Sequence, residues 1–125
     1  MRPIYLVDRD VLIWHLRGRD RTGDLLKHLK DDGPLACSAL TVSEVLRLVK
    51  EQELAKTERL LSSLVVLPVG LNEAEVAAAL MCDHGPGYVD CHIAATALIA
   101  GLAIVTYNRR DFERPGATLW DTSTW

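Results

Sequence analysis

The sequence lacks the features that mark membrane and secreted proteins. No apolar run approaches the roughly 20 residues of a membrane-spanning helix. The segment after Met1 passes directly into a short strand-like run instead of a signal-peptide core. Internal repeats and low-complexity tracts are also missing. We therefore expect a cytoplasmic protein in which residues 1–125 form a single domain.

Cysteine is scarce and odd in number, with only Cys37, Cys82 and Cys91, all within apolar patterns. An odd number argues against a disulfide framework, and we expect reduced, packed thiols. Cys82, His84, Cys91 and His92 are conceivable zinc ligands, but the C-x-x-C spacing of many structural zinc sites is missing. We therefore favour packed thiols over a zinc site.

An excess of positive charge is absent as well, because 14 Lys and Arg residues face 17 Asp and Glu residues for a net charge of -3. This balance argues against broad, sequence-independent binding to long nucleic acids. Two local basic runs remain, namely Arg17, Arg19 and Arg21, and then Arg109, Arg110 and Arg114. Each run taken alone is typical of a solvated loop.

The chain instead contains a regular alternation of strand-like and helix-like segments. Apolar runs predict strands at residues 4–7, 34–37, 65–69 and 102–106, with a fifth candidate at 118–120. Helical spacing predicts helices at residues 11–16, around 25–31, from 38 or 41 to 49, 57–64, 72–84 and 89–100. This order predicts a parallel sheet covered by helices on both faces, with ligands at the carboxyl ends of the strands.

Capping signals refine the helix ends. Ser38 or Thr41 is expected to cap the third helix, which places Val42, Val45, Leu46 and Val49 inward. Thr57 is expected to cap the fourth helix, and Asn72 with Glu75 forms a capping-box-like start for the fifth. Glycines are expected to end helices at Gly33, at Gly85-Pro86-Gly87 and at Gly101.

Two acidic residues in the first half of the chain border the predicted ligand-binding edge. Asp8 directly follows the first strand, although it or Asp10 could serve only as a helix cap. Glu44 shares a helical stripe with Leu40 and Leu48, where a solvated glutamate is unexpected. Its alternative role is an ion pair with Arg47.

Two more acids follow in the second half. Asp90 heads a helical face that carries Ile93, Ala94 and Ala97, and its alternative role is the N-cap of that helix. Asp111 follows the fourth strand after a short loop, and its alternative role is a cap on a turn beginning at Phe112. Four separate capping roles at one sheet edge are a poorer explanation than convergence on one site.

Converging carboxylates repel one another unless a cation neutralises them. Hard oxygen ligands in this number suit Mg²⁺, with Mn²⁺ as a substitute. Such an ion can orient a water and stabilise the pentavalent phosphorus of a phosphoryl-transfer transition state. The acids therefore predict metal-dependent hydrolysis.

These motifs resemble those of a known family, the PIN domains. Residues 5–13 (YLVDRDVLI) are similar to the family's opening Asp motif, and residues 43–46 (SEVL) fall where it carries a helical Glu. The most specific match is residues 90–97 (DCHIAATA), followed by Gly101-Leu102, Val105-Thr106 and residues 108–112 (NRRDF). The resemblance covers nearly the whole chain, whose length suits VapC-type toxins.

The resemblance implies a three-layer α/β/α sandwich and a Mg²⁺-dependent endoribonuclease, the toxin of a prokaryotic type II toxin–antitoxin pair. It implies RNA as substrate, a VapB-like antitoxin as partner, and a homodimer. The implied catalytic and metal-binding residues are Asp8, Glu44, Asp90 and Asp111. Arg9, Asn108 and Arg109 are candidate substrate-binding residues, and Asn108 stands where some relatives place an acid.

Two positions depart from the family pattern. Arg9 replaces a small hydroxyl residue, and His92 replaces an aliphatic one. Arg9 either competes with the metal for the carboxylates or binds the scissile phosphate, and we favour competition. A non-enzymatic alternative is a degenerate PIN domain that only dimerises or binds a partner, with Arg9 filling the metal cavity.

A second enzymatic alternative is a haloacid-dehalogenase-like phosphatase, whose Asp-x-Asp motif fits Asp8-Arg9-Asp10. Leu12 departs from that motif, and no convincing downstream lysine motif is found.

Overall fold

A parallel sheet forms the centre of the computed structural model, which describes residues 1–84, 87–113 and 115–125. Its strands are β1 (Tyr5–Val7), β2 (Leu35–Ser38), β3 (Val65–Leu67) and β4 (Ala103–Val105). Their order is β3-β2-β1-β4 with every pair parallel. The carboxyl ends of the strands therefore meet at one edge. The predicted break at Gly85 and Pro86, and the basic residue Arg114, lie outside the described residues.

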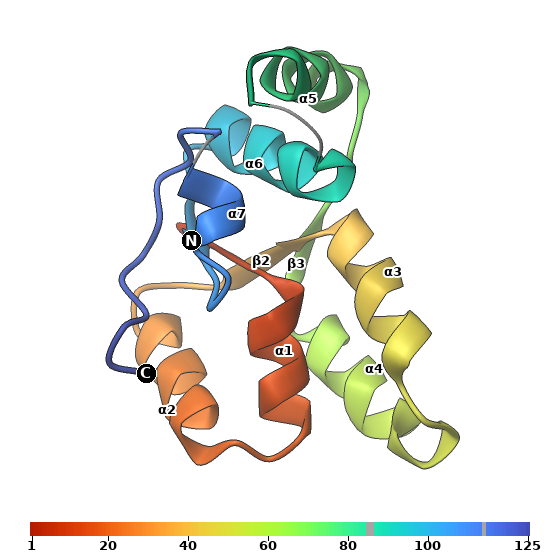
Figure 1. Cartoon of the computed structure of the whole chain (residues 1–125). Helices are drawn as coiled ribbons and strands as arrows, with labels where there is room; N and C mark the ends of the chain where they lie inside the picture. Colours follow the sequence, from red (N-terminus) through yellow and green to blue (C-terminus); the bar gives the residue numbers. More distant parts are fainter. Residues whose placement is uncertain (85–86, 114) are drawn as a thin grey trace.

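Helices cover both faces of this sheet (Figure 1). In chain order they are α1 (Arg9–Leu16), α2 (Asp20–Lys30), α3 (Ala39–Leu48), the 3₁₀ turn η1 (Glu51–Glu53), α4 (Leu54–Ser62), α5 (Leu71–His84), α6 (Tyr88–Ala100) and α7 (Arg110–Glu113). Figure 1 shows α1 to α4 on one side of the sheet, and α5, α6 and α7 on the other. This arrangement confirms the predicted three-layer α/β/α fold. No helix within the described ranges is long and apolar enough to cross a membrane.

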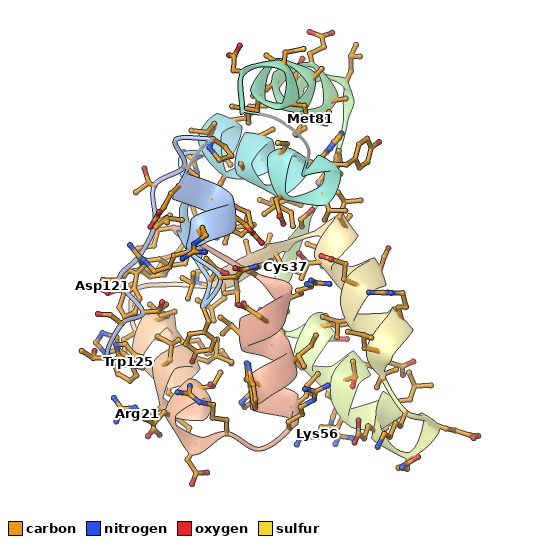
Figure 2. All side chains as sticks on the ribbon, in the orientation of Figure 1. Arg21, Cys37, Lys56, Met81, Asp121 and Trp125 are labelled. Carbon is orange, nitrogen blue, oxygen red and sulfur yellow. The ribbon has the colours of Figure 1, made fainter. Side chains whose placement is uncertain are left out.

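Alternate residues of the central strands supply two separate cores. Val7 and Val105 are fully buried against the layer of α1 to α4. Leu6 and Ile104, also fully buried, pack in the cluster that contains the apolar face of α6. Complete burial of such a side chain contributes about 1.5–3 kcal/mol. Cys37 of β2 is buried with the first cluster and lies near the middle of the molecule (Figure 2).

Three predictions, one about a strand and two about helix ends, differ from the structure. The segment at 118–120 forms only an isolated bridge between Leu119 and Ile104. Thr57 does not cap α4 but lies inside it, where its hydroxyl donates to the carbonyl of Glu53 at 2.9 Å. Since α5 begins at Leu71, Asn72 lies within the helix and is not its cap.

Burial differs from the sequence prediction at two positions. Leu46, expected to face inward on α3, is 39% exposed. Cys37 and Cys91 are buried free thiols as predicted, whereas Cys82 is exposed.

Candidate functional site

Asp8 lies at the carboxyl end of β1 and is 5% exposed. It is the N-cap of α1, since Oδ1 accepts the Arg9 backbone N–H at 2.8 Å. Oδ2 accepts the hydroxyl of Thr106 at 2.8 Å. Burial raises the pKa of Asp8, while these two hydrogen bonds and the charge of Arg9 oppose the rise. Asp8 therefore combines the capping role with a place in the site.

Asp10, two residues after Asp8 in the first turn of α1, is held by the loop that follows β4. Its Oδ2 accepts the backbone N–H of Tyr107 at 3.0 Å, and its Oδ1 accepts that of Val11 at 2.7 Å. Burial, and then the charge of Asp8, raise the pKa of Asp10 to about 6. Asp10 thus fastens the start of α1 to the loop after β4 and stands beside Asp8.

Glu44 points from α3 toward α1. Its Oε2 lies 3.0 Å from Nη1 of Arg9, so the alternative role of Glu44, an ion pair with Arg47, was wrong. The side chain of Glu44 is 18% exposed, but Leu48 is 47% exposed, so the stripe that they share does not face the core along its whole length. Burial raises the pKa of Glu44, and Arg9 is the largest influence that lowers it.

Asp90 lies in the first turn of α6. The N-cap of this helix is Gly87, so the alternative capping role of Asp90 was wrong. Burial, and then the charges of Asp111, Asp8 and Glu44, raise the pKa of Asp90 to about 6, and Arg9 lowers it. Asp90 therefore senses all three of the other predicted acids.

Asp111 lies within α7, not before it, so its alternative role as a cap was also wrong. Nδ2 of Asn108 donates to Oδ2 of Asp111. Nη1 of Arg109, a predicted substrate-binding residue, donates to the carbonyl of Trp120 at 2.9 Å. One N–H group of its guanidinium is therefore already hydrogen-bonded. Its remaining N–H donors, and the roles of Asn108 and Arg9 toward a substrate, stay predictions.

The four predicted acids come from four different segments to the carboxyl edge of the sheet. The charges of Asp111, Asp8 and Glu44 all raise the pKa of Asp90, so the four acids lie close enough to interact electrostatically. Among the residues that the structure describes, no three His, Cys, Asp or Glu side chains are placed so that they could hold a metal ion together. Oε1 of Glu44, however, is buried without a hydrogen-bond partner within the described part of the chain. An unpartnered hard oxygen fits a divalent cation by donor chemistry.

Sequence reasoning missed two residues of this site. Thr106 was placed in a strand and quoted within the family motifs but given no role in the site, yet its hydroxyl joins Asp8 to the loop after β4. Asp10 was considered as a cap and as part of the Asp-x-Asp motif of the phosphatase alternative, but not as a residue of this site, where two backbone N–H groups fix it. The Asp-x-Asp spacing signals Asp10, whereas no local signal marks Thr106.

The family comparison is decisive, because the PIN domain model matches residues 5–117. This chain belongs to the PIN domain family. The match decides against the haloacid-dehalogenase-like alternative.

Relatives of this PIN domain carry ribonuclease and toxin–antitoxin names. It is 37% identical over 108 residues to ribonuclease VapC10 of Mycobacterium tuberculosis, covering 82% of this chain and 81% of the relative. A toxin–antitoxin complex from Klebsiella pneumoniae contains a chain with a TM-score of 0.75 at 28% identity, covering 86% of this chain and 89% of that one. VapBC2 from Rickettsia felis matches with a TM-score of 0.82 over 94% of this chain and 99% of that chain. At 21% identity, this last likeness shows the fold.

Proposed function

We propose that this PIN domain is a metal-dependent endoribonuclease that acts as the toxin of a type II toxin–antitoxin pair. The observation that carries the proposal is the convergence of Asp8, Glu44, Asp90 and Asp111 on one sheet edge, where the charges of the other three acids help to raise the pKa of Asp90. The names of the relatives support the same activity. The reaction is hydrolysis of an RNA phosphodiester bond by water, in the cytoplasm.

Mg²⁺, or Mn²⁺ in its place, is the ion that we propose for this site. Asp8, Glu44, Asp90 and Asp111 are the residues that would hold it, because carboxylate oxygens are the ligands that these ions prefer. When bound, the ion would neutralise the carboxylates, lower the pKa of a water and stabilise charge on the phosphate.

The protein's own contribution is to orient these groups. Thr106 and the N-terminus of α1 fix both oxygens of Asp8. Asn108 orients Asp111 through its side-chain amide. The N–H donors of Arg109 that do not bind Trp120 are available to an RNA phosphate, which a guanidinium binds well.

The principal test replaces Asp90 by Asn. We expect RNA cleavage in Mg²⁺ to fall at least 100-fold, because the substitution removes a carboxylate without changing its shape. Asp121→Asn is the matched control, since Asp121 is an exposed aspartate on the C-terminal segment (Figure 2), and should cleave RNA like the wild type. Undiminished cleavage by wild-type protein in EDTA would contradict the metal mechanism.

The partners that we propose are a VapB-like antitoxin and a second copy of this chain. The toxin–antitoxin complexes among the structural neighbours support the first. Co-expression with a VapB-like antitoxin should give a stable complex with reduced RNA cleavage. Light scattering should show a dimer of the toxin alone at micromolar concentration, and a monomer would contradict that part of the proposal.

The Arg9–Glu44 ion pair favours a second candidate, a non-catalytic binding module in which an arginine replaces the metal. This candidate expects that neither the wild type nor any Arg9 variant cleaves RNA in Mg²⁺ or Mn²⁺. Metal-dependent cleavage that Asp90→Asn abolishes would exclude it.

A further inference from the structure

Arg9 contributes a positive charge at the centre of the acidic site. It is the first residue of α1, directly after Asp8, and its guanidinium reaches across to Glu44 on α3 at 3.0 Å. Within the described ranges, this is the one ion pair that brings a Lys, Arg or His nitrogen within 4.0 Å of an Asp or Glu oxygen. The ion pair found among the described residues therefore lies inside the candidate site.

The two carboxylate oxygens of Glu44 differ in their partners. Oε2 is paired with Arg9, whereas Oε1 is buried without a partner among the described residues. A buried carboxylate oxygen without a hydrogen bond is costly, so this arrangement is one that another ligand would improve. Arg9 therefore already engages one oxygen of a carboxylate that a metal ion would also need.

We propose that Arg9 is a built-in counter-ion that competes with divalent metal for Glu44, so that the site takes up metal only when Arg9 leaves Oε2. The inference rests on the proposed function, because it concerns the same metal site. A guanidinium keeps its charge at every physiological pH, so deprotonation cannot release it. It must rotate away, and its side chain, which is 42% exposed, has access to solvent for that movement.

The competition has a simple electrostatic origin. A bound divalent ion and a guanidinium on one carboxylate repel each other, and Glu44 cannot give Oε2 to both. Arg9 therefore stabilises the metal-free protein and weakens metal binding by the same contact. Removing Arg9 should have opposite effects on these two properties, which a merely structural arginine would not produce.

The test titrates Mg²⁺, and separately Mn²⁺, into protein without RNA by isothermal calorimetry. Arg9→Gln should bind each ion at least tenfold more tightly than the wild type, equivalent to about 1.4 kcal/mol. Arg47→Gln is the matched control, because Arg47 lies one turn from Glu44 on α3 and influences it by charge, but not through the ion pair. It should change the affinity less than threefold. Arg9→Lys, which keeps the charge but loses the planar fork, should fall between the wild type and Arg9→Gln.

Thermal unfolding supplies a second readout. The metal-free Arg9→Gln protein should melt at a lower temperature than the wild type, and Mg²⁺ should raise its melting temperature by more. Unchanged metal affinity in Arg9→Gln and Arg9→Lys would overturn the proposal, as would an equal gain in Arg47→Gln. Unchanged metal affinity with a raised KM for RNA would instead assign Arg9 to phosphate binding. The titration contains no RNA, so it measures metal binding whether or not the protein is a nuclease. A failure of the proposed function would therefore not affect its interpretation.

Discussion

Thr106 joins two parts of the site through a single buried hydroxyl. It donates to Oδ2 of Asp8 at 2.8 Å and accepts the backbone N–H of Asn108 at 3.0 Å. Its own carbonyl accepts the hydroxyl of Thr122 at 2.8 Å. The residue therefore fixes Asp8 relative to the loop that carries Asn108 and leads to Asp111.

Replacing Thr106 by Val tests this positioning role. The change keeps the shape but leaves Oδ2 of Asp8 without its donor and the Asn108 N–H without an acceptor, which should cost about 1–3 kcal/mol in urea unfolding. The Thr106 hydrogen bond lowers the pKa of Asp8. Its loss should therefore move the acid limb of the cleavage profile to higher pH.

Thr106→Ser, which retains the hydroxyl, is the control for this change and should restore the profile toward that of the wild type. A Thr106→Val protein with an unshifted acid limb would show that the hydroxyl has only a structural role.

Asp8, Glu44 and Asp90 could be singled out from the sequence because each interrupts or terminates an apolar pattern, whereas Asp111 was indicated by its place just after the fourth strand. Asp8 after an apolar strand and Asp90 at the head of a buried helical face are visible without any coordinates. The contact between Arg9 and Glu44 was not visible, because it depends on how a long side chain crosses between two helices. Sequence spacing on α3 instead suggested Arg47, which follows Glu44 by nearly one turn.

Helix ends show where local signals suffice. Ser38 was one of two expected caps for α3 and is the actual N-cap, accepting the backbone N–H of Leu40 at 3.1 Å. Gly101, the predicted C-cap of α6, has the left-handed φ of 69° that glycine accommodates best. Thr57 and Asn72 failed as caps because preceding residues already begin their helices, through η1 in the first case. Such continuation depends on surroundings that a capping motif does not contain.

Two glycine substitutions should change stability in opposite directions. A Cβ at Gly101 meets no atom within 4 Å, so Gly101→Ala isolates the backbone strain of a positive φ and should destabilise the protein by about 1–2 kcal/mol. Gly23 lies within α2, and a Cβ there meets only His15 at an ordinary 3.7 Å. Gly23→Ala should therefore stabilise the protein by about 0.5–1 kcal/mol.

Urea unfolding measures both changes, and each variant serves as the control for the other. A Gly101→Ala protein as stable as the wild type, or more stable, would contradict the assignment of strain to Gly101. A destabilised Gly23→Ala protein would contradict the prediction for Gly23.

Two helical layers cover opposite faces of the sheet, and the candidate site lies at the carboxyl edge between them (Figure 1). Asp8 and Glu44 belong to elements of one layer, and Asp90 and Asp111 to elements of the other. Folding therefore brings together negative charges that are far apart in the unfolded chain. Burial, and then these charges, raise the pKa of Asp90 to about 6, from an ordinary value near 3.8 in the unfolded chain.

The sign of the resulting pH dependence follows from proton linkage. Between about pH 4 and pH 6, folded Asp90 binds more protons than unfolded Asp90, so its contribution to the free energy of unfolding falls as the pH rises through this window. His15 acts in the opposite direction, because burial lowers its pKa and charging it at low pH destabilises the fold. A comparison between variants removes this contribution, since both proteins retain His15.

Asp90→Asn should therefore gain stability relative to the wild type as the pH is raised from 4.5 to 7.5 in EDTA, even though it loses cleavage. The measurement is urea unfolding of both proteins at several pH values across this range. Asp121→Asn is the control, because hydrogen bonding to Ser123 lowers the pKa of Asp121 below 3.8. Asp121 is thus already ionised in both the folded and unfolded states above pH 5. The difference in unfolding free energy between Asp121→Asn and the wild type should therefore stay nearly constant above that pH.

Saturating Mg²⁺ should reduce or reverse the advantage of Asp90→Asn, since the ion stabilises the carboxylate that this variant lacks. Parallel wild-type and Asp90→Asn curves in EDTA would show that the carboxylates at this edge do not strain the metal-free fold.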